Sequence, residues 1–89
     1  MAREPLQRAS DELTAAAELA DGKTRERLET QADQLAALAT RESGPDHGRL
    51  ARHMNALHEL ESDTDGEVRD HVVAARKAVS DYRETVEGV

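Results

Sequence analysis

The sequence contains no cysteine, tryptophan, phenylalanine or isoleucine, and only one tyrosine. Without cysteine there is no disulfide framework, no thiolate nucleophile and no cysteine-based zinc or iron–sulfur site. The large apolar side chains are therefore almost all Leu and Val, and alanine fills much of the remainder. The length of 89 residues predicts one helical domain, residues 1–89. The small number of large apolar side chains predicts a thin core and marginal stability as an isolated monomer.

Long hydrophobic runs are also missing. No segment approaches the roughly 18 apolar residues of a membrane span, and the N-terminus lacks the apolar core of a signal peptide. We therefore expect a cytoplasmic protein that does not bind membranes.

Positive charge is scarce: 19 Asp and Glu oppose 12 Lys and Arg, which gives a net charge of −7. This balance argues against binding to nucleic acid or to anionic lipids. High acidity, a preference for Arg over Lys and few aromatic residues are typical of halophilic, salt-adapted proteins, whose carboxylate shell repels itself unless salt screens it. The other interpretation is an ordinary acidic helical protein with solvated charged faces.

Apolar residues recur at helical spacing in four segments. In the last segment they follow one another at intervals of four, three, four, three and four, which places them in one stripe of a helix. The four stripes are Leu6, Ala9, Leu13, Ala16, Ala17 and Ala20; Leu28, Ala32, Leu35, Leu38 and Ala39; Leu50, His53, Met54, Leu57 and Leu60; and Val68, Val72, Ala75, Val79, Tyr82 and Val86.

Breaks between the stripes set the expected helix ends. Pro5 suits a first helical position, Gly22 suits a helix stop, and Ser43-Gly44-Pro45-Asp46 interrupts the chain. Thr64 and Glu67 have the spacing of a capping box. The expected helices run from about Pro5 to before Gly22, from Lys23 to Arg41, from Pro45 or Asp46 to about Glu61, and from Gly66 onward.

The two halves of the chain echo each other at an offset of 44 residues. Asp21-Gly22 aligns with Asp65-Gly66, and apolar positions such as Leu6 and Leu50 also coincide. With connections this short, the sequence predicts an all-α fold: an antiparallel, up-down-up-down four-helix bundle made of two helical hairpins. The alternative is a pair of hairpins that opens and completes its core by dimerisation.

Histidine supplies the only candidates for chemistry. His53 lies on an apolar stripe, where we expect it to be partly buried beside a polar neighbour such as Gln31. His58, His71 and Asp70 flank the 64–66 corner, but no spacing preorganises three or four zinc ligands. The carboxylates lie on helix faces that we expect to be exposed to solvent. The serines do not occur in a sequence pattern typical of a catalytic nucleophile. We therefore predict no catalytic, cofactor-binding or metal-binding residue, and no enzyme.

Several residues suggest a contact surface instead. Leu19 and Val73 lie off their apolar stripes, and a helix-mediated contact would cover them. The segment Gly44–Asn55 is richer in His, Gly and Arg than a helix start requires, which adds His47, Arg49 and Arg52 to the candidate partner contacts.

Three runs carry a resemblance to a known group of proteins: Gln31–Ala36, Gly44–Leu57 and Tyr82–Val89. Through them nearly the whole chain resembles a family of small uncharacterised haloarchaeal proteins, a domain of unknown function. The resemblance implies a helical fold and a salt-rich cytoplasm, and it carries over no catalytic residue.

The leading hypothesis is a non-enzymatic helical interaction module that binds itself or a protein partner. The alternative is a small metal- or pH-responsive regulator that uses the His58/His71/Asp70 corner. A nucleic-acid accessory, supported only by the local group of His47, Arg49 and Arg52, is disfavoured by the acidic charge.

Overall fold

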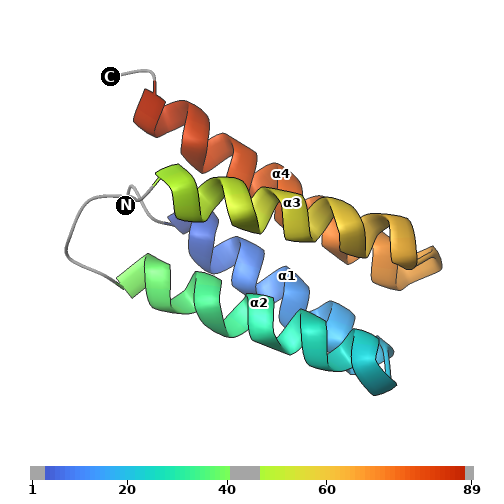
Figure 1. The fold of residues 1–89 in the computed structure, drawn as a ribbon. Coiled ribbons are helices and arrows are strands. Elements are labelled where there is room, and N and C mark those ends of the chain that lie inside the picture. The colour runs from blue at the N-terminus through green and yellow to red at the C-terminus, as the bar shows by residue number, and fades with distance from the viewer. Residues whose placement is uncertain (1–3, 41–46, 88–89) are drawn as a thin grey trace.

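The computed structural model describes residues 4–40 and 47–87, which form four helices and no strand (Figure 1). Side chains are described for residues 4–40 and 48–84, so the Ser43–Asp46 break and the side chains of His47 and Val86 lie outside the described part. The helices are α1 (Glu4–Leu19), α2 (Gly22–Thr40), α3 (His47–Asp63) and α4 (Gly66–Glu87). The all-α prediction is confirmed, and the helices pack as a bundle 38 × 20 × 19 Å in extent.

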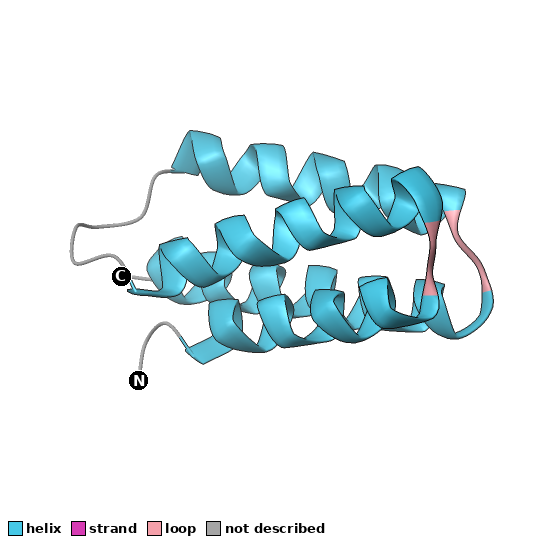
Figure 2. Cartoon of the chain, turned by 90° about the horizontal axis from the view of Figure 1, so that it is seen from below, coloured by secondary structure: helices cyan, strands magenta, loops and turns pink. Residues whose placement is uncertain are grey.

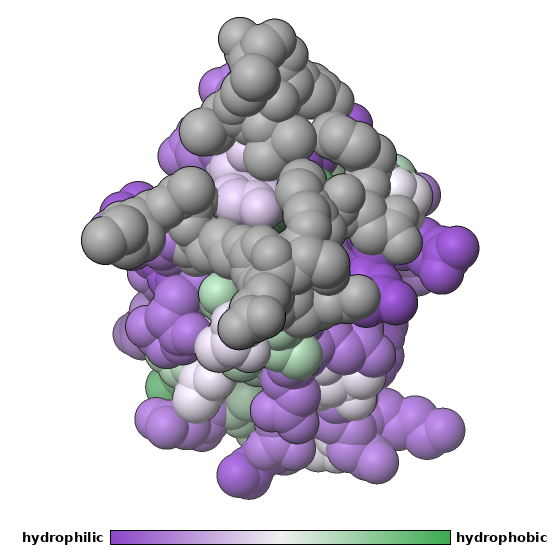
Figure 3. Space-filling view, turned by 90° about the vertical axis from the view of Figure 1, so that its left-hand side faces the viewer, coloured by the Kyte–Doolittle hydropathy of each residue, from purple (hydrophilic) through white to green (hydrophobic). Residues whose placement is uncertain are grey.

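The core forms where the four stripes meet. Nine large side chains are almost completely buried: Leu6, Leu13, Leu28, Leu35, Leu50, Leu57, Leu60, Val72 and Val79. Leu38, Tyr82 and buried alanines complete it, while Met54 and Val68 pack against its edge. Where the face of the molecule in Figure 3 is coloured, most of it is hydrophilic, with small apolar areas between. The stripes therefore predict the core well, and the core is as poor in large side chains as the composition indicates.

Each of the two short corners contains a glycine with a positive φ. Gly22 has a φ of 62° and Gly66 a φ of 57°, a left-handed region that favours glycine. In each corner the preceding aspartate accepts the first helical hydrogen bond through its carbonyl: Arg25 N–H donates to Asp21 O at 3.3 Å, and Arg69 N–H to Asp65 O at 3.2 Å. Both corners lie at the same end of the bundle (Figure 2).

One local prediction is wrong in detail. Thr64 precedes the N-cap of α4, because the helix begins at Gly66 and Asp65 holds the cap position. The Thr64 hydroxyl instead donates to the Leu60 carbonyl at 2.6 Å and so satisfies an acceptor in the last turn of α3. Gly22 likewise begins α2 rather than only ending α1.

Packing between the helices is uneven. Helix α1 packs closely against both α2 and α4, α3 packs less closely against α4, and α2 and α3 barely meet. Figure 1 shows α2 and α3 side by side, with α1 and α4 behind them. The line between α2 and α3, which we call the α2–α3 seam, is consequently the least closed part of the bundle.

Candidate binding site in the α2–α3 seam

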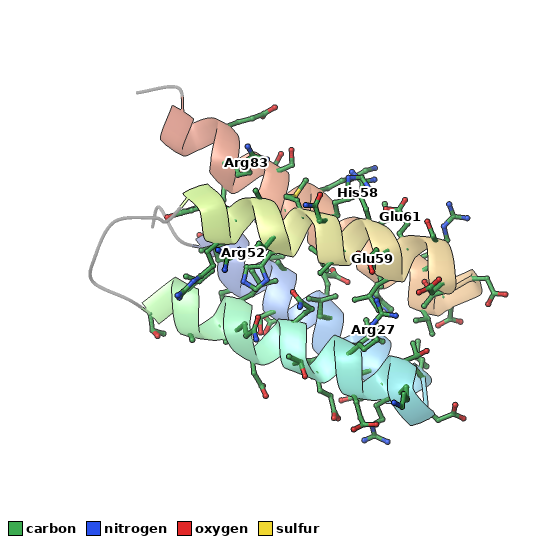
Figure 4. All side chains as sticks on the ribbon, viewed as in Figure 1. Arg27, Arg52, His58, Glu59, Glu61 and Arg83 are labelled. Carbon is green, nitrogen blue, oxygen red and sulfur yellow. The ribbon has the colours of Figure 1, made fainter. Side chains whose placement is uncertain are left out.

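Three contacts define how far the seam is closed. Near the corners, Arg27 of α2 reaches α3 and pairs with Asp63 at 3.0 Å and with Glu59 at 3.6 Å. Farther along, His53 Nδ1 donates to Gln31 Oε1 across the seam at 2.6 Å. Figure 4 shows Arg27 and Glu59 facing each other across the seam and Arg52 toward its other end. The seam is therefore bridged at the corner end and in the middle.

Beyond His53 the seam opens into a cavity of about 400 Å³, which we call the His53 pocket. Arg49 and Arg52 from α3 contribute its positive charge, and the described lining contains no acidic residue. The full lining is Gln31, Gln34, Ala37, Arg49, Arg52 and His53. A smaller hollow of about 200 Å³ lies between Arg27 and Gln31. The two hollows together form a discontinuous groove along the seam.

His53 is the buried polar group of this site, with only 4% of its surface exposed. Burial lowers the pKa of His53 below its ordinary value of 6.5, and the positive charge of Arg49 lowers it further. The Gln31 oxygen accepts the Nδ1 hydrogen, which fixes the orientation of the ring. The other ring nitrogen, Nε2, takes no part in this bond. The predicted partner of His53 is thereby confirmed.

Near the corner that His58, His71 and Asp70 flank, the side chains make two separate contacts. His71 Nδ1 donates to Glu12 Oε1 of α1 at 2.7 Å, so the ring turns toward α1 rather than toward His58 of α3. Glu61 is bound by Arg76, whose Nε donates to Glu61 Oε2 at 2.7 Å. Positions 71 and 76 lie about 140° apart around a helix, so one faces α1 and the other α3. Within residues 4–40 and 47–87, no group of three or more His, Asp or Glu side chains could hold a metal ion.

The Glu61–Arg76 pair is an interaction that sequence reasoning missed. Both side chains are mostly covered, with 17% and 23% of their surfaces exposed. The hydrogen bond from Arg76 is the main cause that holds the pKa of Glu61 below its ordinary value of 4.5. Burial acts in the opposite direction, and the positive charges of Arg76 and Arg69 lower the pKa further. The 44-residue offset could have drawn attention to this pair. It aligns Glu61 with Ala17 and Arg76 with Ala32, so two charged residues stand where the first half of the chain has alanines.

The first helix pair has small side chains at these two positions. Ala17 and Ala32 are buried, and small side chains let α1 and α2 approach closely. Ser10 uses the close approach to donate to the Ala32 carbonyl at 2.8 Å. A long glutamate and a long arginine stand at the matching positions of α3 and α4, which pack less closely than α1 and α2.

The five candidate contact residues do not form one surface. Arg49 and Arg52 share the His53 pocket. Leu19 is 52% exposed and lies at the last position of α1, beside the corners and so at the other end of the bundle. Val73 is half-buried on α4. The helix α3 begins at His47, whose side chain is outside the described part.

Comparison with known proteins places the chain. Residues 1–85 match a family of unknown function, DUF7553. The chain belongs to this family. Neither the curated proteins nor the solved structures searched gave a match. Membership in DUF7553 agrees with the resemblance to a domain of unknown function and assigns no role to any residue. In the described part of this DUF7553 chain, no helix is long and apolar enough to cross a membrane.

Proposed function

We propose that this chain is a non-enzymatic helical interaction module that associates with a second copy of itself through the α2–α3 seam. The observation that carries the proposal is the sparse contact between α2 and α3, which leaves one side of an otherwise closed bundle as a groove. A second copy rather than an unrelated protein partner is favoured by the charges along this seam.

The seam is self-complementary in charge. Its open end carries Arg49 and Arg52, and its corner end carries the exposed carboxylates of Glu59 and Asp63. In a two-fold symmetric dimer the same patch faces itself in reverse, so the basic end of one copy meets the acidic end of the other. Such an arrangement covers the groove in both copies and reinforces a thin core.

We also propose that the helices alternate in direction. Connections of two residues between Leu19 and Gly22, and between Asp63 and Gly66, leave no length for a chain to return along the bundle. The two equivalent glycine corners support two hairpins of the same design. A protein partner could take the place of the second copy, a proposal that rests on the exposed residues of the seam. A salt-rich cytoplasm is proposed as the setting because of the acidic composition.

Sedimentation equilibrium over a range of protein concentrations in 1 M KCl tests this function. At that salt the screening length is about 3 Å, so the repulsion between two acidic chains is suppressed while direct contacts persist. We expect a reversible dimer. A strict monomer at every concentration would refute self-association, and binding of a protein partner to the monomer would assign the seam to that partner.

A further inference from the structure

The His53 pocket concentrates positive charge on a chain that is otherwise acidic. Arg49 and Arg52 project from successive turns at the start of α3, where an interval of three residues places them on one side of the helix. No acidic side chain belongs to the described lining, although the whole chain carries a net charge of −7. Arg52 makes no ion pair with a described residue. Its guanidinium therefore has donors to offer a ligand.

The pocket also has a fixed, buried polar wall. His53 is almost fully buried and is held by its hydrogen bond to Gln31. The Gln31 amide uses its oxygen in this bond, so its nitrogen retains N–H donors, and Gln34 on the next turn adds a second amide. A volume of about 400 Å³ lies within the range of small-molecule sites, roughly 300–1,000 Å³.

These groups together select the chemistry of a ligand. The planar guanidinium fork matches the two oxygens of a carboxylate or a phosphate, and amide N–H groups add donors without adding charge. We propose that the His53 pocket binds a small free oxyanion, a carboxylate or a phosphate, held by Arg52 against the His53–Gln31 pair, with the positive charge of Arg49 beside it. The site does not require self-association. In the proposed dimer the carboxylates of the second copy would compete with the oxyanion for Arg52.

The test follows the His53 imidazole by NMR while inorganic phosphate, citrate or a tetraglutamate peptide is added. Protein concentration is kept where sedimentation shows a monomer, and KCl holds the ionic strength constant. With phosphate or citrate we expect the His53 signals to shift and to saturate in the millimolar range or below. Arg52→Gln should weaken that binding about tenfold, because one charge-assisted fork is lost.

Arg25→Gln is the matched control, since it removes the same charge from an exposed arginine that pairs with Glu29 at the corner end of α2. It should leave the affinity at the wild-type value. If both variants weakened anion binding equally, the anion would be attracted by the overall charge of the protein and not by this pocket, and the proposed site would be overturned. Absence of saturation with either small anion, or saturation with the peptide alone, would also overturn it, and the latter result would assign the pocket to a protein segment.

Discussion

His53 Nδ1 lies 2.6 Å from Gln31 Oε1, and this hydrogen bond joins α3 to α2 where the two helices barely meet. A buried imidazole in this position has one firm polar partner, and its environment disfavours a positive charge. Closure of the seam in its middle therefore depends on His53 remaining neutral and on Gln31 accepting its hydrogen.

The first prediction concerns pH. The folded state lowers the pKa of His53, so the unfolded chain binds a proton more readily. Stability from this residue is complete above its ordinary pKa of 6.5 and is lost as the pH falls from there through the lower, folded pKa. His53→Gln, which retains an amide for hydrogen bonding but cannot titrate, should flatten this part of the pH dependence. Urea unfolding at pH 8 and pH 5 measures the change.

His58→Gln is the control for that series, because His58 is exposed on the same helix and does not line the seam. It should retain the wild-type difference between the two pH values. A wild-type slope that persists in His53→Gln would contradict the role given to the buried ring.

The second prediction concerns the other half of the hydrogen bond. Gln31→Leu removes the acceptor and leaves the buried imidazole unsatisfied, which should destabilise the fold by about 1–3 kcal/mol. Gln34→Leu, one turn away on the exposed side of the same pocket, should change stability by less than about 0.5 kcal/mol. Denaturant midpoints with equal m-values provide the comparison, and equal effects of the two substitutions would argue against a special Gln31–His53 pair.

A third prediction tests the equivalence of the two corners. Space is open where a Cβ would stand at Gly22 and at Gly66, so an alanine meets only the cost of its positive φ. Gly22→Ala and Gly66→Ala should each destabilise the fold by a similar amount, about 1–2 kcal/mol. Gly48→Ala lies in α3 without a positive φ and should instead stabilise it by up to about 1 kcal/mol. Thermal unfolding of the three variants measures these changes. A shift of all three melting temperatures in the same direction would contradict the prediction.

A fourth prediction concerns the ion pair between Glu61 of α3 and Arg76 of α4. The pKa of Glu61 is lowered in the folded state, so its contribution is present above pH 4.5 and is lost as the pH falls through the folded pKa. Glu61→Gln should therefore lower stability at pH 7 and should approach wild type in acid. Glu59→Gln removes a carboxylate that is 72% exposed and should have a smaller effect at pH 7. Chemical denaturation at both pH values distinguishes the two variants.

Sequence reasoning was strongest where periodicity decides structure. The buried leucines and valines, the two Asp-Gly corners and the contact between His53 and Gln31 all follow from spacing and from the need of a buried polar group for a partner. The partner of His71 could not be predicted in this way, because it depends on how α4 is rotated against its two neighbours: His71 forms a hydrogen bond with Glu12 of α1. The open seam was equally inaccessible, because it results from unequal spacing of the helices and not from any one stripe.

Charge reversal across the seam tests the central claim most directly. Arg52→Glu and Glu59→Arg each place like charges opposite one another in the proposed two-fold dimer, whereas the double variant restores opposite charges. Sedimentation in 1 M KCl should show a dimer for the wild-type chain, weakened association for each single variant and recovered association for the double variant. A monomeric wild-type chain, or single variants that associate as strongly as the wild type, would contradict the account.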